Sequence, residues 1–226
     1  LVSQRIPATL QLALGSILVM LIVGAPLGVF TAVRPHSPVA HLVSLISAVA
    51  LATPTFWLGL LLILYFSVSR KMLPASGYVT FTEDPIEAVK HLLLPALTLG
   101  AYGTAVLIRF LNASLTDALK ADYIRVAYAK GLHERAVVMR HALKVALPPV
   151  ITILALQFGQ LLGGAAVTES AFGWPGLGRL ILDAISNRDY LVVQSTMLLF
   201  VTIFVLLNIL ADVGYALLNP RIRLGR

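Results

Sequence analysis

The sequence predicts an all-α membrane protein whose helices cross the bilayer several times. Of its 226 residues, 58% are hydrophobic and only 12% are charged, whereas a soluble domain carries about 25% charged residues. Apolar stretches recur along the chain, and each reaches the length of about 20 residues that a helix needs to cross the hydrocarbon core. We therefore expect a single polytopic transmembrane domain that occupies residues 1–226.

Five apolar segments account for the predicted spans. They lie at about residues 6–33, 39–68, 92–111, 148–167 and 191–218. Proline removes a backbone donor and kinks a helix, and the spans contain Pro26, Pro54 and Pro95. The spacing of Gly24 and Gly28 is the small-xxx-small pattern that allows helices to approach closely. Two interpretations of Pro54 stay open: an ordinary packing kink, or a flexing point of a moving pathway.

The distribution of charge predicts how the chain is oriented. The loops between spans fall on alternate sides of the membrane. One side holds 11 of the 17 Lys and Arg residues and four of the ten acidic residues, while the other side holds six of each. Because basic loops stay in the cytoplasm, we expect residues 112–147 and the C-terminus to be cytoplasmic and residues 70–91 and 169–190 to be external. The N-terminus is then external and the number of spans is odd.

The sequence shows no arrangement of residues that is typical of a catalytic site. There is no Cys, and the five His residues form no pair spaced as metal ligands on an apolar face. No phosphate-binding loop is present, so we expect this chain to hydrolyse no nucleotide itself. The basic residues lie in short loops that flank apolar runs, which argues against binding of nucleic acid. We expect no catalytic residue, cofactor or metal in the chain.

Charged residues are also missing from the centres of the predicted spans. Carriers driven by protons or sodium usually bury ionisable groups near the middle of the bilayer. Here Arg109 and Asp212 lie near the predicted inner ends and Glu169 lies near an outer end. An ion-coupled secondary carrier therefore stays an alternative that the sequence disfavours, and a structural or assembly factor of the membrane is a further one.

The long polar loop at residues 112–147 is the strongest functional signal. It is prone to form helices on both sides of Gly131, and a glycine there predicts a left-handed cap followed by a turn. The following segment, 133–147, has an apolar set of Ala136, Val137, Met139, Ala142, Leu143 and Ala146. Such a helix could lie on the membrane surface, or it could be a docking site for a partner outside the membrane.

The loop resembles the cytoplasmic loop of the membrane subunits of binding-protein-dependent ABC importers. That loop has the general form Glu-Ala-Ala, three residues, Gly, nine residues, Ile-x-Leu-Pro. Here Gly131 takes the glycine and Leu143 the leucine, although Arg125 and Val126 replace Glu and Ala. Ala129-Lys-Gly-Leu132 and Arg140-His-Ala-Leu143 are similar to the motifs at these positions in the dipeptide, oligopeptide and nickel branch of the family. Further segments that are similar to the same branch occur along the chain, at residues 6–10, 54–57, 73–77, 169–179 and 219–223.

The resemblance implies an all-α permease subunit of the type I importer kind, in a bacterial or archaeal cytoplasmic membrane. It implies a second, similar permease subunit, two cytoplasmic ATPase subunits that bind ATP and Mg, and an extracytoplasmic substrate-binding protein. Members of the family usually carry a further N-terminal helix, which we expect to be absent from this chain. The implied substrate is a peptide, with nickel, glutathione or haem as alternatives within the same importer type.

The same resemblance assigns two sets of site residues. The residues expected to couple the chain to an ATPase subunit are Ala127, Lys130, Gly131, Leu132, His133, Glu134 and Arg135. The residues expected to line the translocation pathway are Thr53, Phe56, Gln157 and Glu169. For the external segment Gly173-Trp-Pro-Gly-Leu-Gly178, a simple set of turns and a re-entrant turn with Trp174 at the membrane interface both stay open.

The predicted orientation can be tested with single cysteines, because the chain has no native Cys. Cysteines placed at Gly77 and Asn187 should react in intact cells with a thiol reagent that does not cross the membrane, since both positions are predicted to be external. A cysteine at Thr116 should react only after the membrane is permeabilised. Labelling of Thr116 in intact cells would reverse the topology.

Overall fold

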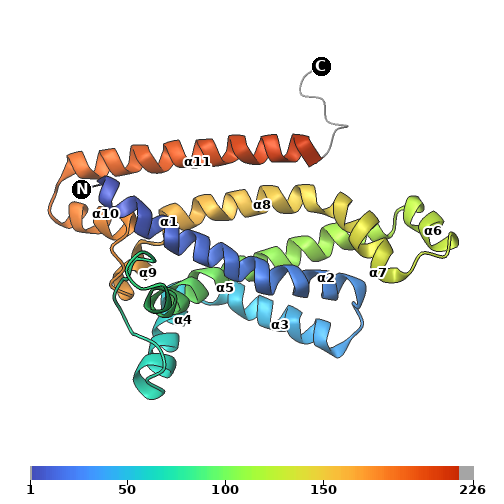
Figure 1. The fold of residues 1–226 in the computed structure, drawn as a ribbon, viewed down its shortest axis with the longest axis horizontal. Helices are drawn as coiled ribbons and strands as arrows, with labels where there is room; N and C mark the ends of the chain where they lie inside the picture. Colours follow the sequence, from blue (N-terminus) through green and yellow to red (C-terminus); the bar gives the residue numbers. More distant parts are fainter. Residues whose placement is uncertain (1, 219–226) are drawn as a thin grey trace.

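The computed structural model describes residues 2–218, and the described residues form helices joined by turns (Figure 1). The three π-helical stretches are η1 (Met20–Gly24), η2 (Ile63–Ser69) and η3 (Val137–Ala142). The α-helices are α1 (Val2–Val19), α2 (Ala25–Val33), α3 (Pro38–Ala52), α4 (Thr55–Leu62), α5 (Pro85–Leu119), α6 (Asp122–Ala129), α7 (Glu134–Ala136), α8 (Leu143–Gly164), α9 (Ala166–Ala171), α10 (Leu177–Ser186) and α11 (Tyr190–Leu218). The expected all-α transmembrane fold is confirmed.

Helix α5 is the element against which most other helices pack. Its first turn is capped by Asp84, whose carboxylate accepts hydrogen bonds from the N–H groups of Ile86 and Glu87 at 2.9 and 3.1 Å. Helices α1, α2, α3, α4 and α8 all contact α5, and α11 packs on the outer side of α8 (Figure 1). Helix α5 is longer than the third predicted span, because helix continues past the apolar part at both ends.

Glycines bring the first span close to α5. A Cβ atom on Gly24 would lie 3.0 Å from the side chain of Leu107, and one on Gly28 would lie 3.0 Å from that of Leu111. The small-xxx-small prediction is therefore confirmed for this pair. The first span runs without a break from Val2 to Val33, with the π-helical turn η1 just before Pro26. That turn supplies the irregular hydrogen bonding that a proline inside a helix requires.

The second predicted span is not straight. Helix α3 ends at Ala52, helix α4 begins at Thr55, and the two axes are bent by 107°. The N–H and hydroxyl of Thr53 both bond the carbonyl of Val49, at 3.0 and 2.7 Å, so α3 ends in a closed turn. Because Pro54 disfavours a helical conformation for the residue before it, the chain turns here. Residues 2–218 thus contain four helices long and apolar enough to cross a membrane, or five when the bent pair counts as one span.

The fourth span also differs from the prediction, which started it at Pro148. The helix begins at Glu134 and continues through Pro148 and Pro149 to Gly164. The polar segment and the membrane span are therefore one continuous helix. The predicted segment followed the apolar residues alone, whereas helix extends back through the polar residues, and the π-helical stretch η3 precedes the two prolines.

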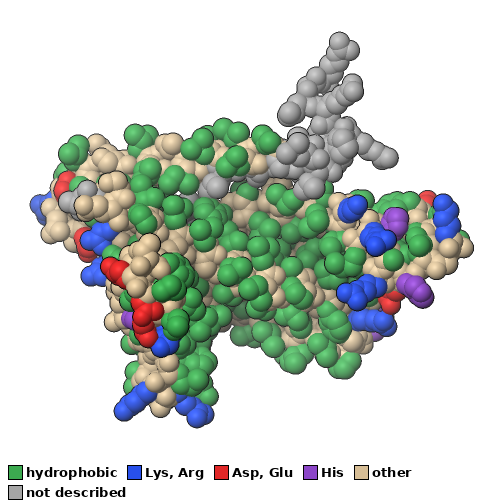
Figure 2. Space-filling model, viewed as in Figure 1, with side chains coloured by type: hydrophobic (Ala, Val, Ile, Leu, Met, Phe, Trp, Pro, Cys, Tyr) green, Lys and Arg blue, Asp and Glu red, His purple; other side chains and the backbone are tan. Residues whose placement is uncertain are grey.

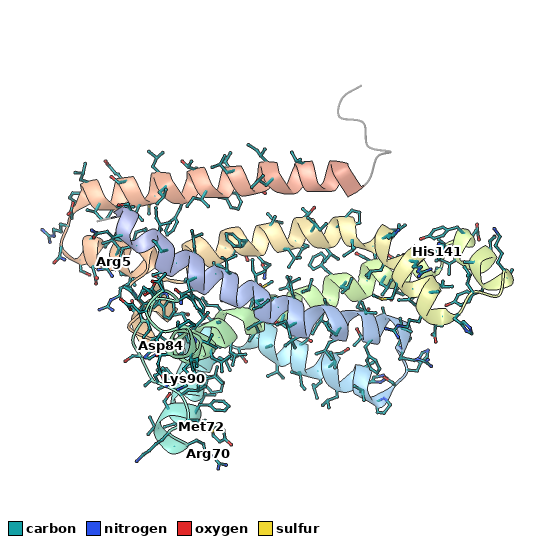
Figure 3. All side chains as sticks on the ribbon, in the orientation of Figure 1. Arg5, Arg70, Met72, Asp84, Lys90 and His141 are labelled. Carbon is teal, nitrogen blue, oxygen red and sulfur yellow. The ribbon has the colours of Figure 1, made fainter. Side chains whose placement is uncertain are left out.

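The two predicted sides of the chain lie at opposite ends of the molecule. Arg5 and Asp84 lie at one end and His141 lies at the other (Figure 3). Charged side chains gather at these ends, and hydrophobic side chains cover the surface between them (Figure 2). Residues 219–223 and the predicted cytoplasmic C-terminus lie outside the described residues.

A buried polar network closes the end that carries the N-terminus. The hydroxyl of Thr9 donates to the carboxylate of Glu169 at 3.1 Å and accepts from the N–H of Leu177 at 2.8 Å. The indole N–H of Trp174 donates to the carbonyl of Ala8 at 2.8 Å. Trp174 is fully buried and meets the ring of Tyr78 edge-on. The ring and the N–H of Trp174 thus both bind protein, while its predicted depth at the membrane interface stays a prediction.

This network also joins the two segments that are predicted to be external. The N–H of Gly77, which has φ +112°, donates to the carbonyl of Phe172 at 3.0 Å. Gly173 adopts φ +61°, and the backbone then turns so that Trp174 can enter the core. Both glycines occupy left-handed conformations that favour glycine. The segments at 73–77 and 169–179, far apart in the sequence, thus form one cap over α1.

Replacement of Thr9 by valine tests how much this cap stabilises the fold. Valine has nearly the same shape but leaves the N–H of Leu177 and an oxygen of Glu169 without their partner, which costs about 1–3 kcal/mol. We expect the melting temperature of the purified protein in detergent to fall by roughly 5 °C, measured by circular dichroism. Thr202→Val is the control, because that hydroxyl is exposed and bonds only the local carbonyl of Leu198. Equal melting of the Thr9 variant and the control would contradict this role.

Candidate functional sites

The segment between α6 and α7 is a helix end closed by a glycine. Gly131 has φ +77°. Its N–H donates to the carbonyl of Tyr128 at 2.9 Å, and the N–H of Leu132 donates to the carbonyl of Ala127 at 3.4 Å. These two bonds form a Schellman cap, which needs a left-handed residue at the position of Gly131. The cap predicted from the sequence is confirmed, and α7 begins after it at Glu134.

The structure separates the seven residues of the expected coupling segment into two groups. Six of them are exposed: Lys130, Gly131, Leu132, His133, Glu134 and Arg135. Ala127 is instead buried in α6, with 6% of its surface exposed. The side chain of Ala127 therefore belongs to the base of the segment and not to the surface that a partner could touch.

That base is a buried apolar cluster shared by five elements. Leu115 of α5 and Val137 of η3 are both 0% exposed. The full cluster consists of Ala32, Leu115, Ala118, Ile124, Ala127, Val137, Val138, Ala142 and Ala146. Because close-packed interiors transmit displacement, a shift of α6 and α7 also moves the ends of α5 and α8.

The π-helical turn η3 changes which residues of this segment are buried. The predicted apolar face included Met139, but its side chain is 51% exposed, while Val138 is buried. A π-helical turn adds a residue and so shifts every side chain after it around the axis. Met139 therefore lies on the exposed surface of the segment.

An ion pair links the exposed segment to the end of the first span. Arg34 follows α2, and its guanidinium donates to the carboxylate of Glu134 at 3.0 Å. Both side chains are about half exposed or more, so the pair adds at most about 1 kcal/mol. The sequence pattern did not predict this contact, since the two residues are 100 positions apart.

Further exposed groups extend the surface around Gly131. On α6, Tyr123 and Val126 are 42% and 53% exposed, and a spacing of three puts them on one helix face. Lys, Arg and His side chains gather at the same end of the molecule (Figure 2). The surface thus offers apolar and cationic groups together, on a base that is itself buried.

The expected pathway residues fall at two different places. Gln157 of α8 lines a cavity of about 120 Å³ with Thr55 of α4 and Tyr102 of α5. Thr53 and Phe56 lie on either side of the bend at Pro54. In the sequence they are close to Thr55, which lines the cavity. The sequence interpretation missed Thr55, Tyr102 and Gln160. The only feature of the sequence that could have indicated these three residues is that they are polar residues in otherwise apolar stretches.

Glu169 lies elsewhere, in the buried cap. Its carboxylate accepts from the hydroxyl of Thr9 and from the N–H of Arg179 at 2.8 Å, and Gly178 donates a further backbone bond. Burial raises the pKa of the Glu169 carboxyl above its ordinary value, and these three hydrogen bonds oppose that shift. Its side chain is enclosed by protein, with 0% exposure, and lines no open space in this conformation.

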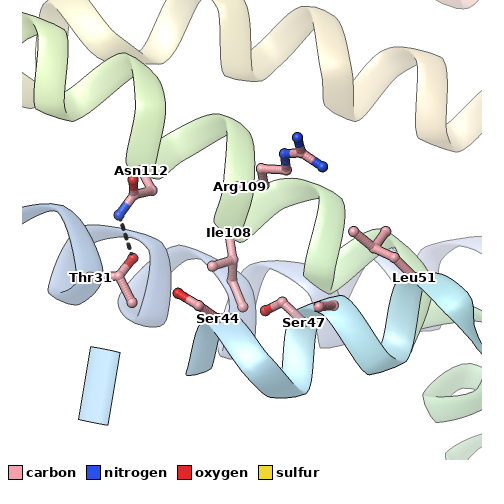
Figure 4. Close-up of a pocket in the computed structure, with 8 residues that line it drawn as sticks. Thr31, Ser44, Ser47, Leu51, Ile108, Arg109 and Asn112 are labelled. Atoms are coloured by element: carbon pink, nitrogen blue, oxygen red, sulfur yellow. Dashed lines mark hydrogen bonds between the residues drawn. The ribbon is translucent and has the colours of Figure 1, made fainter. Parts of the chain in front are cut away.

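A larger polar cavity of about 300 Å³ lies between α2, α3 and α5 (Figure 4). The amide of Asn112 donates to the hydroxyl of Thr31 at 2.9 Å across it, and Ser44 and Ser47 line the α3 side. Arg109 lies at its edge and points away from the serines (Figure 4). Residues 2–218 contain no cluster of three His, Asp or Glu side chains placed to hold a metal ion.

Comparison with known proteins identifies relatives along the whole chain. The chain is 41% identical over 237 residues to the di/tripeptide transport system permease protein DppB of Pseudomonas aeruginosa (strain UCBPP-PA14), a match that covers 96% of this chain and 70% of the relative. It is 40% identical to the dipeptide permease DppB of Escherichia coli (strain K12), covering 97% of this chain and 71% of the relative. It is 43% identical to the glutathione permease GsiC of the same strain, covering 98% and 70%.

A solved structure has the same fold. The MetNI methionine ABC transporter in an inward-facing conformation matches with a TM-score of 0.75 at 19% identity, over 97% of this chain and 96% of that chain. The family model for the binding-protein-dependent transport system inner membrane component matches residues 24–224. The chain therefore belongs to this family of inner membrane permease components of binding-protein-dependent ABC importers.

Proposed function

We propose that this permease component forms half of a pathway that carries small peptides inward. A second permease subunit provides the other half, two cytoplasmic ATP-binding subunits supply the energy, and an extracytoplasmic binding protein delivers the peptide. The observation that carries this proposal is the exposed segment from Lys130 to Arg135, held on a buried base. The ATP-binding subunits dock on that segment.

The continuity of α7, η3 and α8 supports a mechanical role for the segment. Helix runs from Glu134 to Gly164 without a break in the backbone. Glu134 and Gln157 are therefore joined by about 35 Å of helix. Because a packed helix moves nearly as a rigid unit, a displacement of the docking segment reaches the cavity beside Gln157. This coupling explains how ATP binding outside the membrane changes access to the pathway.

The relatives support small peptides as the substrate class. Two of them are named for dipeptides or tripeptides and one for glutathione, which is chemically also a tripeptide. Such solutes share amide groups and free carboxylates, whose recognition needs hydrogen-bond donors. The cavity beside Gln157 supplies donors of this kind from Thr55 and Tyr102.

Substitution of Gly131 tests the docking segment. Valine at φ +77° strains the backbone by about 1–2 kcal/mol or more, while no atom lies within 4 Å of the added Cβ. Gly131→Val should therefore leave insertion intact and lower ATP-driven peptide uptake by roughly tenfold in proteoliposomes that contain the complete importer. Gly131→Asn is the matched control, since asparagine tolerates the left-handed conformation. Normal uptake and normal copurification of the ATPase subunits with Gly131→Val would contradict this role.

Reversal of charge at Glu134 separates docking from folding. Glu134→Arg should weaken copurification of the ATPase subunits several-fold, because a surface ion pair contributes little to folding itself. The double variant with Arg34→Glu restores the internal ion pair but not the charge that Glu134 presents to a partner. We expect the assembly defect to persist in the double variant. Full recovery would show that Glu134 acts only through Arg34.

A further inference from the structure

The bend between α3 and α4 leaves the first turn of a helix open inside the protein. The N–H groups of Trp57 and Leu58 donate to the carbonyl of Pro54, each at 3.1 Å. The N–H groups of Thr55 and Phe56 have no acceptor among the described residues. A helix start with unpaired N–H groups carries partial positive charge and favours acceptor or anionic groups. A broken helix inside a membrane protein is tolerated where it lines a cavity.

The cavity at this helix start is lined by polar side chains from three helices. Thr55 lies on α4, Tyr102 on α5, and Gln157 and Gln160 on α8. Tyr102 is the central residue of α5, which runs from Pro85 to Leu119. The four side chains therefore meet near the middle of the bundle, at the depth where transporters commonly place a substrate site.

Gln157 is the most buried of the four polar side chains that line the cavity. Its side chain is 8% exposed, and the described part of the chain offers it no hydrogen bond. Its amide atoms are not among the fully enclosed side-chain atoms that lack a partner, so the amide faces the open cavity. The unpaired amide of Gln157 lines the same cavity as the unpaired start of α4, although the two belong to different elements. Together they indicate a group that enters the cavity from outside the chain.

The chemistry of the lining selects the kind of group. The backbone N–H can only donate, the amide and hydroxyl side chains can donate or accept, and no acidic side chain lines the cavity. Arg109 lies seven residues after Tyr102 on α5, which is the same face about 10 Å further along the helix. Arg109 is exposed and forms no ion pair within residues 2–218. Donors at the cavity and a cation beyond it suit a carboxylate.

We propose that the cavity at the start of α4 binds the terminal carboxylate of a peptide in transit. The free N–H group of Thr55 and the amide of Gln157 donate to the carboxylate oxygens. This assignment rests on the proposed function of peptide import, and it names the recognition site within it. Because every group at the site is neutral, the carboxylate is held by hydrogen bonds alone and can leave again, as transport requires.

The test uses the complete importer in proteoliposomes and one dipeptide in two forms, the free acid and the C-terminal amide. Gln157→Leu should lower the uptake of the free acid about tenfold relative to the amide, the loss expected for one hydrogen bond to a charged group. Gln157→Glu should lower it further, because two carboxylates then repel. Thr202→Val on the exposed face of α11 is the control. Preferences of the binding protein cancel when each variant is compared with the native complex.

A second measurement does not depend on the binding protein or on uptake. Because the chain has no Cys, Thr55→Cys adds a single thiol to it at the cavity. Its reaction with a small thiol reagent should be slowed severalfold by the free acid and not by the amide, and Gln157→Leu should abolish the protection. Tyr102→Phe, which removes one hydroxyl oxygen, gives a variant least prone to misfold and should weaken the protection by the free acid.

The outcomes separate the two proposals. If the native complex takes up neither form of the dipeptide, the proposed function is wrong and the carboxylate site falls with it. If the native complex takes up the free acid while the Gln157 variants change both forms equally or not at all, only the site is overturned. Equal protection of Thr55→Cys by the acid and the amide overturns the site as well.

Discussion

Close approach of helices to α5 is the constraint on which the rest of the structure depends. In lipid, apolar surface gains little by leaving its surroundings, so helices associate through tight packing of small residues. Gly24 and Gly28 on the first span meet Leu107 and Leu111, and Gly103 on α5 meets Met20. These contacts fix η1 and α2 against the middle of α5. The cavity beside Tyr102 and the loop beyond α5 then take their positions from that packing.

The two ends of the bundle differ in how they are held. At the N-terminal end, Thr9, Glu169 and Trp174 form buried hydrogen bonds between segments more than 150 residues apart. Such a network costs much to open, because each group would be left buried and unpaired. At the other end, α6 and α7 rest on apolar packing, with one exposed ion pair at Glu134. Apolar contacts without fixed directions allow small shifts, which fits the docking role that we propose for this end.

The sequence predicted the features that depend on composition along the chain. Hydropathy located the apolar segments, and Gly131 gave the left-handed helix end, since both follow from local properties. The sequence could not show that the chain bends by 107° at Pro54 but stays helical through Pro148. A proline can break a helix or be accommodated within it, and the neighbouring residues decide which occurs. Burial of Trp174 and Ala127 depends on contacts distant in sequence, which a single sequence does not show.

The broken helix and the continuous helix have complementary roles at the same cavity. Helix α4 begins there with unpaired N–H groups at a bend that Thr53 closes on the α3 side. Helix α8 passes the cavity at Gln157 and continues to the exposed segment at Glu134. Because α4 contacts α5 and α9, and α9 carries Glu169 of the buried cap, the α4 side of the cavity is tied to the fixed end of the bundle. The α8 side is tied to the responsive end. In the proposed mechanism, a shift of α8 along its axis changes the distance between Gln157 and the start of α4, and so changes the shape of the cavity that they share.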